Sequence, residues 1–113
     1  MVPEVDLEAF AAAHADGAFV IDVREPYEYA EGHVPGAKLI PLAGLPQQAV
    51  GLASRQPVYV ICASGHRSLT AAQFLSRRGI DAKSFADGTE GWISRGLPVV
   101  YGDVENGPDA ATK

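Results

Sequence analysis

A single cysteine stands in the stretch where this sequence is best equipped for chemistry. Cys62 follows the apolar run 58–61 and precedes a segment from about Ser68 to Gly79 in which apolar residues recur at helical spacing. The first segment predicts a buried strand and the second a helix, so the loop 62–67 delivers the cysteine to a helix N-terminus. Backbone N–H groups that lack helical partners can there surround an anion. Such surroundings lower the pKa of a thiol from about 8.5 to about 3.5–7.5, which predicts a thiolate at neutral pH.

A lone cysteine after an apolar strand is more often a small buried hydrophobic residue than a nucleophile. Ser64, Gly65 and Arg67 favour the nucleophile, because a core cysteine has no need of a polar turn and a cation beside it. We therefore interpret Cys62 as catalytic. The rest of its active-site loop is Ala63, Ser64, Gly65, His66 and Arg67.

The elements that must position this loop alternate between strand-like and helix-like segments. We expect helices at 7–14, 26–31, 45–52, about 68–79 and from 87–92 onward, and strands at 18–23, 38–40, 58–61 and 80–85. This alternation predicts an α/β fold with a small, open, mainly parallel sheet flanked by helices. A chain of 113 residues suits one domain, which we place at 1–101, and the polar residues 102–113 predict a disordered tail.

Charged residues are also expected beside the cysteine. In open α/β sheets ligands bind at the carboxyl ends of the strands, so Asp22 and Arg24, which follow the strand 18–23, should lie at the same edge as Cys62. Glu28 lies in the helix that comes next. Asp22, Arg24 and Glu28 are therefore candidate supporting residues.

The overall composition excludes several classes of function. A net charge of −5 argues against a nucleic-acid-binding surface, and no apolar run reaches the length of about 18 residues that a membrane span needs. No acidic residue occurs between Glu31 and Asp81, so the surroundings of the loop are locally cationic and favour a small anionic substrate.

The cysteine and histidine content indicates the compartment and the metal content. One cysteine cannot form an internal disulfide, and no signal-like segment is seen, so a cytoplasmic location is expected. The three histidines show no metal-ligand spacing, and one cysteine does not supply a zinc site. We expect neither a metal nor a cofactor.

Three motifs, in order, resemble those of the rhodanese, or thiosulfate sulfurtransferase, family in its single-domain form. Residues 22–29 (Asp-Val-Arg-Glu-Pro-Tyr-Glu-Tyr) with 32–37 (Gly-His-Val-Pro-Gly-Ala) resemble its N-terminal signature. Residues 62–68 (Cys-Ala-Ser-Gly-His-Arg-Ser) resemble its active-site loop, and 88–92 (Gly-Thr-Glu-Gly-Trp) its C-terminal signature. The resemblance covers about residues 5–99.

The resemblance implies a two-step sulfur transfer. Cys62 would attack a small anionic sulfur donor or a protein persulfide, keep the outer sulfur as a persulfide, and pass it to a nucleophilic acceptor such as a thiol or cyanide. Arg67 would either orient an anionic donor or form a structural ion pair with Asp22 or Glu28, and the sequence leaves both alternatives open. Ala63 and Ser64 carry no charge, which predicts slow turnover of the dianion thiosulfate and a preference for a less charged or protein donor.

Two other functions compete with this one. A sulfur-carrier or redox-binding module that receives sulfur from a partner protein would contain the same cysteine and loop. The related phosphatases and arsenate reductases also use a cysteine loop that ends in arginine, but they have five residues between the two, whereas four separate Cys62 from Arg67.

Overall fold

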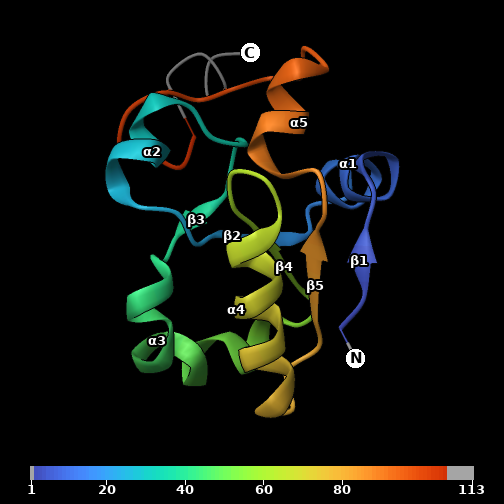
Figure 1. Ribbon diagram of the computed structural model, residues 1–113, viewed down its shortest axis with the longest axis vertical. Coiled ribbons are helices and arrows are strands. Elements are labelled where there is room, and N and C mark those ends of the chain that lie inside the picture. Colours follow the sequence, from blue (N-terminus) through green and yellow to red (C-terminus); the bar gives the residue numbers. More distant parts are fainter. Residues whose placement is uncertain (1, 107–113) are drawn as a thin grey trace.

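A five-stranded parallel sheet forms the centre of the computed structural model, which describes residues 2–106 (Figure 1). The strands lie in the order β1-β5-β4-β2-β3, and every neighbouring pair runs parallel. Their bounds are β1 Glu4–Val5, β2 Phe19–Asp22, β3 Lys38–Leu39, β4 Val58–Ile61 and β5 Ala82–Phe85. The strand that precedes the cysteine therefore lies in the middle of the sheet, where a continuous apolar run is typical.

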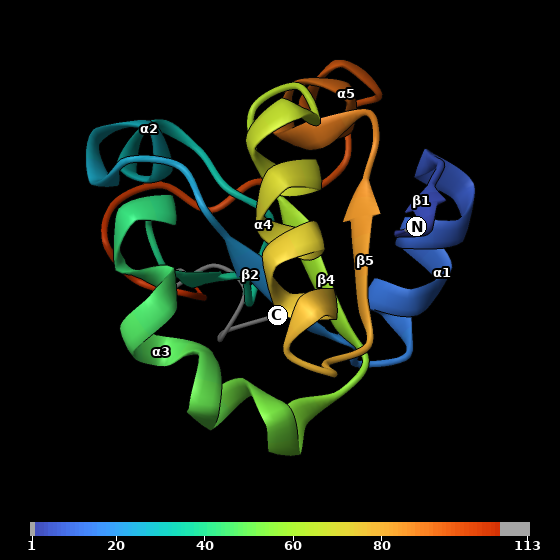
Figure 2. The ribbon, with the colours of Figure 1, turned by 60° about the horizontal axis from the view of Figure 1, so that its bottom comes forward.

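Helices cover both faces of the sheet (Figure 2). They are α1 Leu7–Ala15, α2 Pro26–Glu31, α3 Leu45–Leu52, α4 His66–Arg77 and α5 Gly88–Ser94. Side chains of α3 and α4 pack with Val58 and Val60 in one apolar cluster, whereas those of α1 and α5 pack with Ile61 and Phe85 in the other. Successive residues of β4 thus serve opposite faces, as the two-residue repeat of a strand requires.

This architecture confirms the predicted fold class, an open parallel α/β sheet flanked by helices, and shows two differences in detail. The helix after the cysteine begins at His66, two residues before the expected start near Ser68, because Gly65 adopts φ +99° and turns the chain directly into the helix. The short strand β1 is absent from the predicted elements. Its two residues pair with β5, and a tertiary pairing of this length leaves little trace in the sequence pattern.

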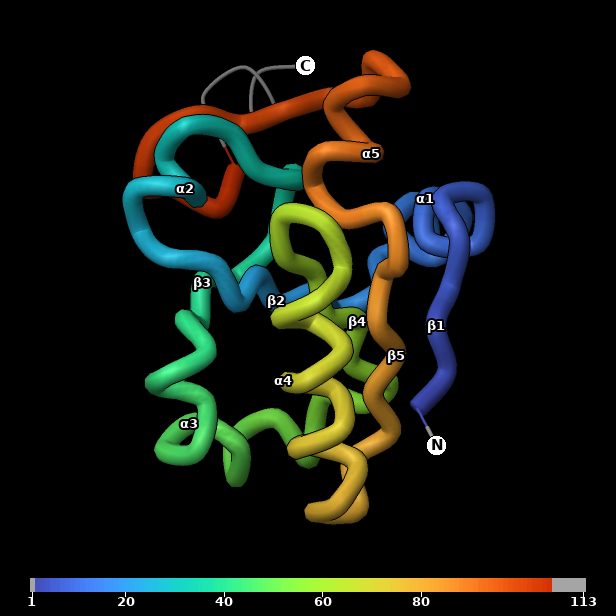
Figure 3. The backbone as a smooth tube through the Cα atoms, viewed as in Figure 1, coloured from blue at the N-terminus to red at the C-terminus, as the bar shows by residue number. Residues whose placement is uncertain are grey.

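The last described residues lie against α2 and the connection that follows it (Figure 3). Gly102 donates its N–H to the Ala30 carbonyl at 2.9 Å, and Gly36 donates to the Glu105 carbonyl at 2.8 Å. The predicted tail spans 102–113, and its residues 107–113 lie outside the described residues. Among residues 2–106, no helix is long and apolar enough to cross a membrane.

Candidate active site

The cysteine loop lies at the carboxyl edge of the sheet, between the end of β4 and the start of α4 (Figure 1). Parallel pairing aligns Asp22 of β2 with Ile61 of β4, and Val23 donates its N–H to the Ile61 carbonyl at 3.0 Å. The segment that follows β2 and the loop that follows β4 are therefore neighbours. The predicted placement of both at one edge agrees with this register.

Hydrogen-bond donors converge on the sulfur of Cys62. The backbone N–H groups of Gly65 and Ser68 donate to Sγ at 3.1 and 3.3 Å, and the Ser68 hydroxyl lies 3.6 Å from it. Burial raises the pKa of the thiol, because Cys62 is only 1% exposed, but hydrogen bonds from the Ser68 hydroxyl and from the amides of Ser68, Ser64 and Gly65 outweigh it. The pKa is held below its ordinary value, so the loop favours a thiolate.

Two glycines allow the loop to fit closely against the start of α5. A Cβ on Gly65 would overlap the Ala86 carbonyl oxygen, and a Cβ on Gly88 would lie 2.6 Å from the Ala63 carbonyl carbon. Both glycines also have positive φ, which other residues rarely adopt. Glu90 donates its N–H to the Ala63 carbonyl at 3.1 Å and holds the two segments together. The segment 88–92 therefore packs directly against the cysteine loop.

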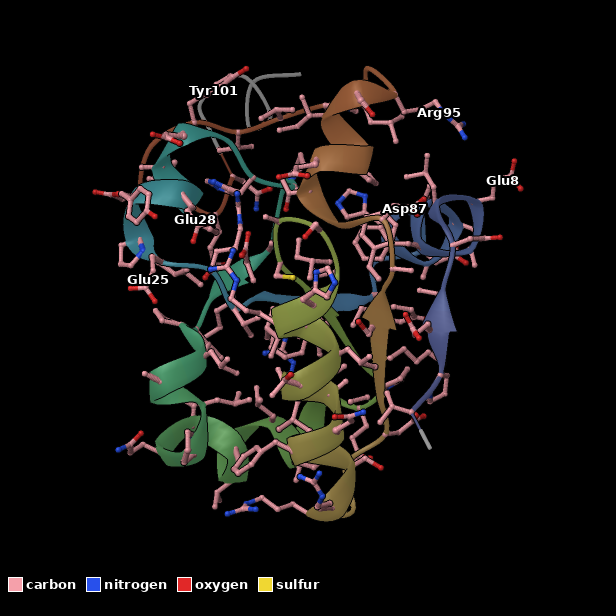
Figure 4. The ribbon with its side chains drawn as sticks, in the orientation of Figure 1. Glu8, Glu25, Glu28, Asp87, Arg95 and Tyr101 are labelled. Atoms are coloured by element: carbon pink, nitrogen blue, oxygen red, sulfur yellow. The ribbon has the colours of Figure 1, made fainter. Side chains whose placement is uncertain are left out.

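Arg67, at the end of the loop, forms a two-pronged ion pair with Glu28 of α2. Its Nη1 and Nη2 atoms donate to Oε1 and Oε2 of Glu28 at 2.8 and 2.9 Å. The hydrogen bonds from Arg67 lower the pKa of Glu28 to about 2 against the opposing effect of burial, and the same bonds raise the pKa of Arg67. Of the acidic partners expected for Arg67, the structure shows Glu28, which occupies both prongs of the guanidinium. Figure 4 shows Glu28 on α2, near the loop.

Asp22 and Arg24 form a separate pair. Nε of Arg24 donates to Oδ1 of Asp22 at 2.9 Å, its Nη2 donates to Oδ2 at 2.8 Å, and the same Nη2 donates to the Gly32 carbonyl at 2.9 Å. Both side chains are buried. Their partners lie on the segment that follows β2, so these two candidates support the shape of the α2 region, whereas Glu28 reaches the loop through Arg67.

The remaining predicted loop residues lie at its outer side. Ser64 and His66 are exposed, with Ser64 Oγ 3.4 Å from His66 Nδ1, and Ala63 is partly buried. Ser64 and His66 thus belong to the solvent-exposed part of the loop, whereas Cys62 is buried.

Two buried serines behind the sulfur were not among the predicted site residues. Ser68 is the last residue of the motif 62–68 but has no predicted role at the sulfur, and Ser84 of β5 lies 2.8 Å from it, Oγ to Oγ. A serine in an otherwise buried strand was a signal in the sequence, but its partner could be found only once β4 and β5 were known to be neighbours.

A surface hollow of about 500 Å³ lies elsewhere, lined by residues that include Phe19, Arg55 and Tyr59. It borders the beginning of β2 and the segment before β4, whereas the cysteine follows the opposite end of β4. None of its lining residues belongs to the cysteine loop, so hydrogen-bonding geometry rather than cavity size identifies the site. Within residues 2–106, no three His, Cys, Asp or Glu side chains are grouped as a metal site would require.

Comparison with known proteins gives the same picture as the motifs. The family model for the rhodanese-like domain matches residues 6–95. A sulfurtransferase of Allochromatium vinosum is 31% identical over 103 residues, which cover 88% of this chain and 96% of that protein. YrkF of Bacillus subtilis, whose name proposes a sulfur-carrier role, is 39% identical over 80 residues, which cover 69% of this chain and 43% of that protein.

Solved structures share the fold. A rhodanese-related protein of Thermoplasma volcanium superposes with a TM-score of 0.80 at 32% identity, covering 87% of this chain and 97% of the other. The chain thus spans nearly all of two of these proteins but less than half of YrkF.

Proposed function

The chain belongs to the rhodanese-like family, and on that premise we propose that it is a sulfurtransferase that carries sulfane sulfur as a persulfide on Cys62. The observation that carries the proposal is the convergence of two backbone amides and the Ser68 hydroxyl on Sγ. These hydrogen bonds lower the pKa of the Cys62 thiol and so favour the thiolate, which is the nucleophilic form of cysteine.

In the first half-reaction the Cys62 thiolate attacks the outer sulfur of the donor. With thiosulfate, a bond forms between Sγ and that sulfur while the bond to the sulfonate sulfur breaks, and sulfite departs with the bonding electron pair. The enzyme then holds a persulfide anion, so charge and atoms balance without a cofactor. Because Cys62 is 1% exposed, the donor must present its sulfur end-on, as the terminal atom of a persulfide or of thiosulfate does.

In the second half-reaction a nucleophile attacks the outer sulfur and Cys62 leaves as the thiolate. Cyanide yields thiocyanate, and a thiol yields a new persulfide with its proton passing to the transferred sulfur. The amides that stabilise the thiolate before loading stabilise it again as the leaving group.

The charges around the loop support a preference for a donor of low charge, such as an organic persulfide or a protein persulfide. Ala63 and Ser64 are uncharged, and the one cation of the loop, Arg67, is already paired with Glu28. A dianion such as thiosulfate therefore meets a nearly neutral ion pair in place of a free cation.

A sulfur-carrier module is the second candidate, because YrkF is named for that role and the cysteine chemistry would be the same. In that case Cys62 would accept sulfur from a partner protein with little turnover of small molecules. A phosphatase-like reaction has less support, since four residues between Cys62 and Arg67 give a smaller ring of amides than five would. For either sulfur-transfer function we propose a cytoplasmic location, where a single unpaired cysteine stays reduced.

The test is the intact mass of the protein after incubation with thiosulfate, with and without cyanide. Wild-type protein should gain one sulfur atom and lose it when cyanide is added, whereas Cys62→Ser should gain none and produce no thiocyanate. Steady-state thiocyanate production then separates the two candidates, because a carrier loads once but turns over slowly. Sulfur loading of Cys62→Ser would refute both.

A further inference from the structure

Two buried hydroxyl groups form a chain that ends on the Cys62 sulfur. The Ser68 hydroxyl lies 3.6 Å from Sγ and 2.8 Å from the Ser84 hydroxyl. Both serines have no exposed surface, and Ser84 comes from β5, the strand beside the one that precedes the cysteine. The chain therefore approaches the sulfur from inside the protein, opposite the exposed residues of the loop.

The number of protons on the thiol and the two hydroxyl groups determines which way the hydrogen bonds between Ser84, Ser68 and Cys62 run. Each hydroxyl can donate one hydrogen bond, and among the described residues the hydroxyl of Ser84 is hydrogen-bonded to that of Ser68 alone. If the Cys62 thiol donated to Ser68, one buried proton would be left without an acceptor: that of Ser84 if Ser68 donated to Ser84, or that of Ser68 if Ser84 donated to Ser68. A buried donor without an acceptor is unfavourable. In the opposite direction Ser84 donates to Ser68, Ser68 donates to the sulfur, and every proton is used.

We infer that Ser84 is a positioning residue, which orients the Ser68 hydroxyl so that it donates to Sγ of Cys62. Hydrogen-bond donors then occupy the side of the sulfur that faces the protein interior, and the free lone pairs of the sulfur point toward the exposed side of the loop. Once a persulfide forms, the negative charge moves to the outer sulfur, and the hydrogen bond from the Ser68 hydroxyl to Sγ weakens. This hydrogen bond strengthens again when Cys62 leaves as the thiolate, so Ser84 assists the second half-reaction. This last consequence rests on the proposed sulfur transfer, whereas the orientation of the hydroxyl does not.

The pH dependence of Cys62 alkylation tests the inference without any sulfur chemistry. In Ser84→Ala the Ser68 hydroxyl is free to rotate, so its hydrogen bond to the Cys62 thiolate weakens. The alkylation midpoint should therefore rise by about 0.5–1 pH unit. Below the midpoint this lowers the alkylation rate about three- to tenfold. The control is Ser76→Ala, because it removes a hydroxyl from the same helix as Ser68 but at the exposed end of α4 that is remote from the cysteine loop. It should leave the midpoint in place.

A second pair of variants tests whether Ser84 acts through Ser68. Ser68→Ala removes the direct donor and should raise the alkylation midpoint at least as much as Ser84→Ala does. The variant that combines both substitutions should show no further rise. The titratable and charged side chains near the loop are the same in all of these variants: Arg67 and His66 on α4, Glu28 on α2, Asp22 at the end of β2, Arg24 after it, and Asp87 and Glu90 at the start of α5.

An unchanged midpoint in Ser84→Ala would overturn the inference, as would an equal shift in Ser76→Ala or a full additional shift in the variant that combines Ser68→Ala with Ser84→Ala. The proposed function fails independently, if wild-type protein acquires no sulfur on Cys62. A midpoint shift in Ser84→Ala combined with failure of sulfur loading would leave the orienting role of Ser84 in place and remove only its catalytic consequence.

Discussion

Replacing Glu28 with glutamine should change the donor preference of the site. In the native protein both prongs of the Arg67 guanidinium are held by the Glu28 carboxylate, at 2.8 and 2.9 Å. Glutamine keeps the size of the side chain and one acceptor oxygen but removes the negative charge. Arg67 then becomes a net cation at the end of the cysteine loop, and we expect KM for thiosulfate to fall about tenfold with little change in kcat.

The magnitude follows from the position of the pair near the surface. At an effective dielectric of about 20, a cation about 5 Å from one unit of donor charge contributes ~3 kcal/mol before desolvation and entropy reduce it. The Arg67 side chain is 37% exposed, so water and salt screen part of this attraction. If about half remains, the gain is ~1.5 kcal/mol, which is roughly a tenfold change in affinity.

The assay is cyanide-dependent thiocyanate production over a series of thiosulfate concentrations, at low and high salt. Glu31→Gln is the matched control, because Glu31 is exposed at the other end of α2 and its substitution removes the same charge without freeing Arg67. We expect it to change KM by less than about twofold. An unchanged KM in a folded Glu28→Gln protein, or an equal fall in Glu31→Gln, would show that the ion pair does not select the donor.

Three further predictions concern the loop and the residues that support it. Ser64→Lys should lower KM for thiosulfate and steepen its dependence on salt, and wild-type protein that already turns over thiosulfate efficiently would contradict this account. Gly88→Ala should cost about 1–3 kcal/mol of unfolding free energy in urea, since its Cβ would lie 2.8 Å from the Cys62 carbonyl oxygen, whereas Gly51→Ala, in open space on α3, should not destabilise the protein. Because pairing lowers the pKa of Glu28 from 4.5 to about 2, the stability advantage of wild type over Glu28→Gln, about 1–2 kcal/mol after screening, should be present above pH 4.5 and vanish as pH falls toward 2.

The parts of the site that the sequence predicted are those whose residues adjoin one another in the chain. The apolar run, the cysteine, Gly65 and the following helix all belong to one continuous stretch, so local rules suffice to place them. The fold class could be predicted for a similar reason, since the alternation of strands and helices is a local pattern.

The partner of Arg67 depends on strand order and could not be settled from the sequence. Asp22 and Glu28 were both suitable candidates. In the structure Asp22 is taken by Arg24, two residues away, and Glu28 projects from the helix after β2, the strand beside β4. The Ser84 contact was missed because β5 follows a whole helix after the loop, and only sheet pairing brings it behind the sulfur.

The balance between burial and hydrogen bonding at Cys62 also bears on the direction of sulfur flow. Burial disfavours the charge on the thiolate, and the amides and the Ser68 hydroxyl favour it, so the pKa is lowered by less than the hydrogen bonds alone would lower it. In the sulfur transfer that we propose, loading moves the charge away from Sγ by one S–S bond, about 2 Å. The persulfide would then lose part of the hydrogen bonding that Sγ receives in the thiolate, and that hydrogen bonding returns when Cys62 leaves as the thiolate. The donors around Sγ would therefore favour release of the sulfur more than its uptake.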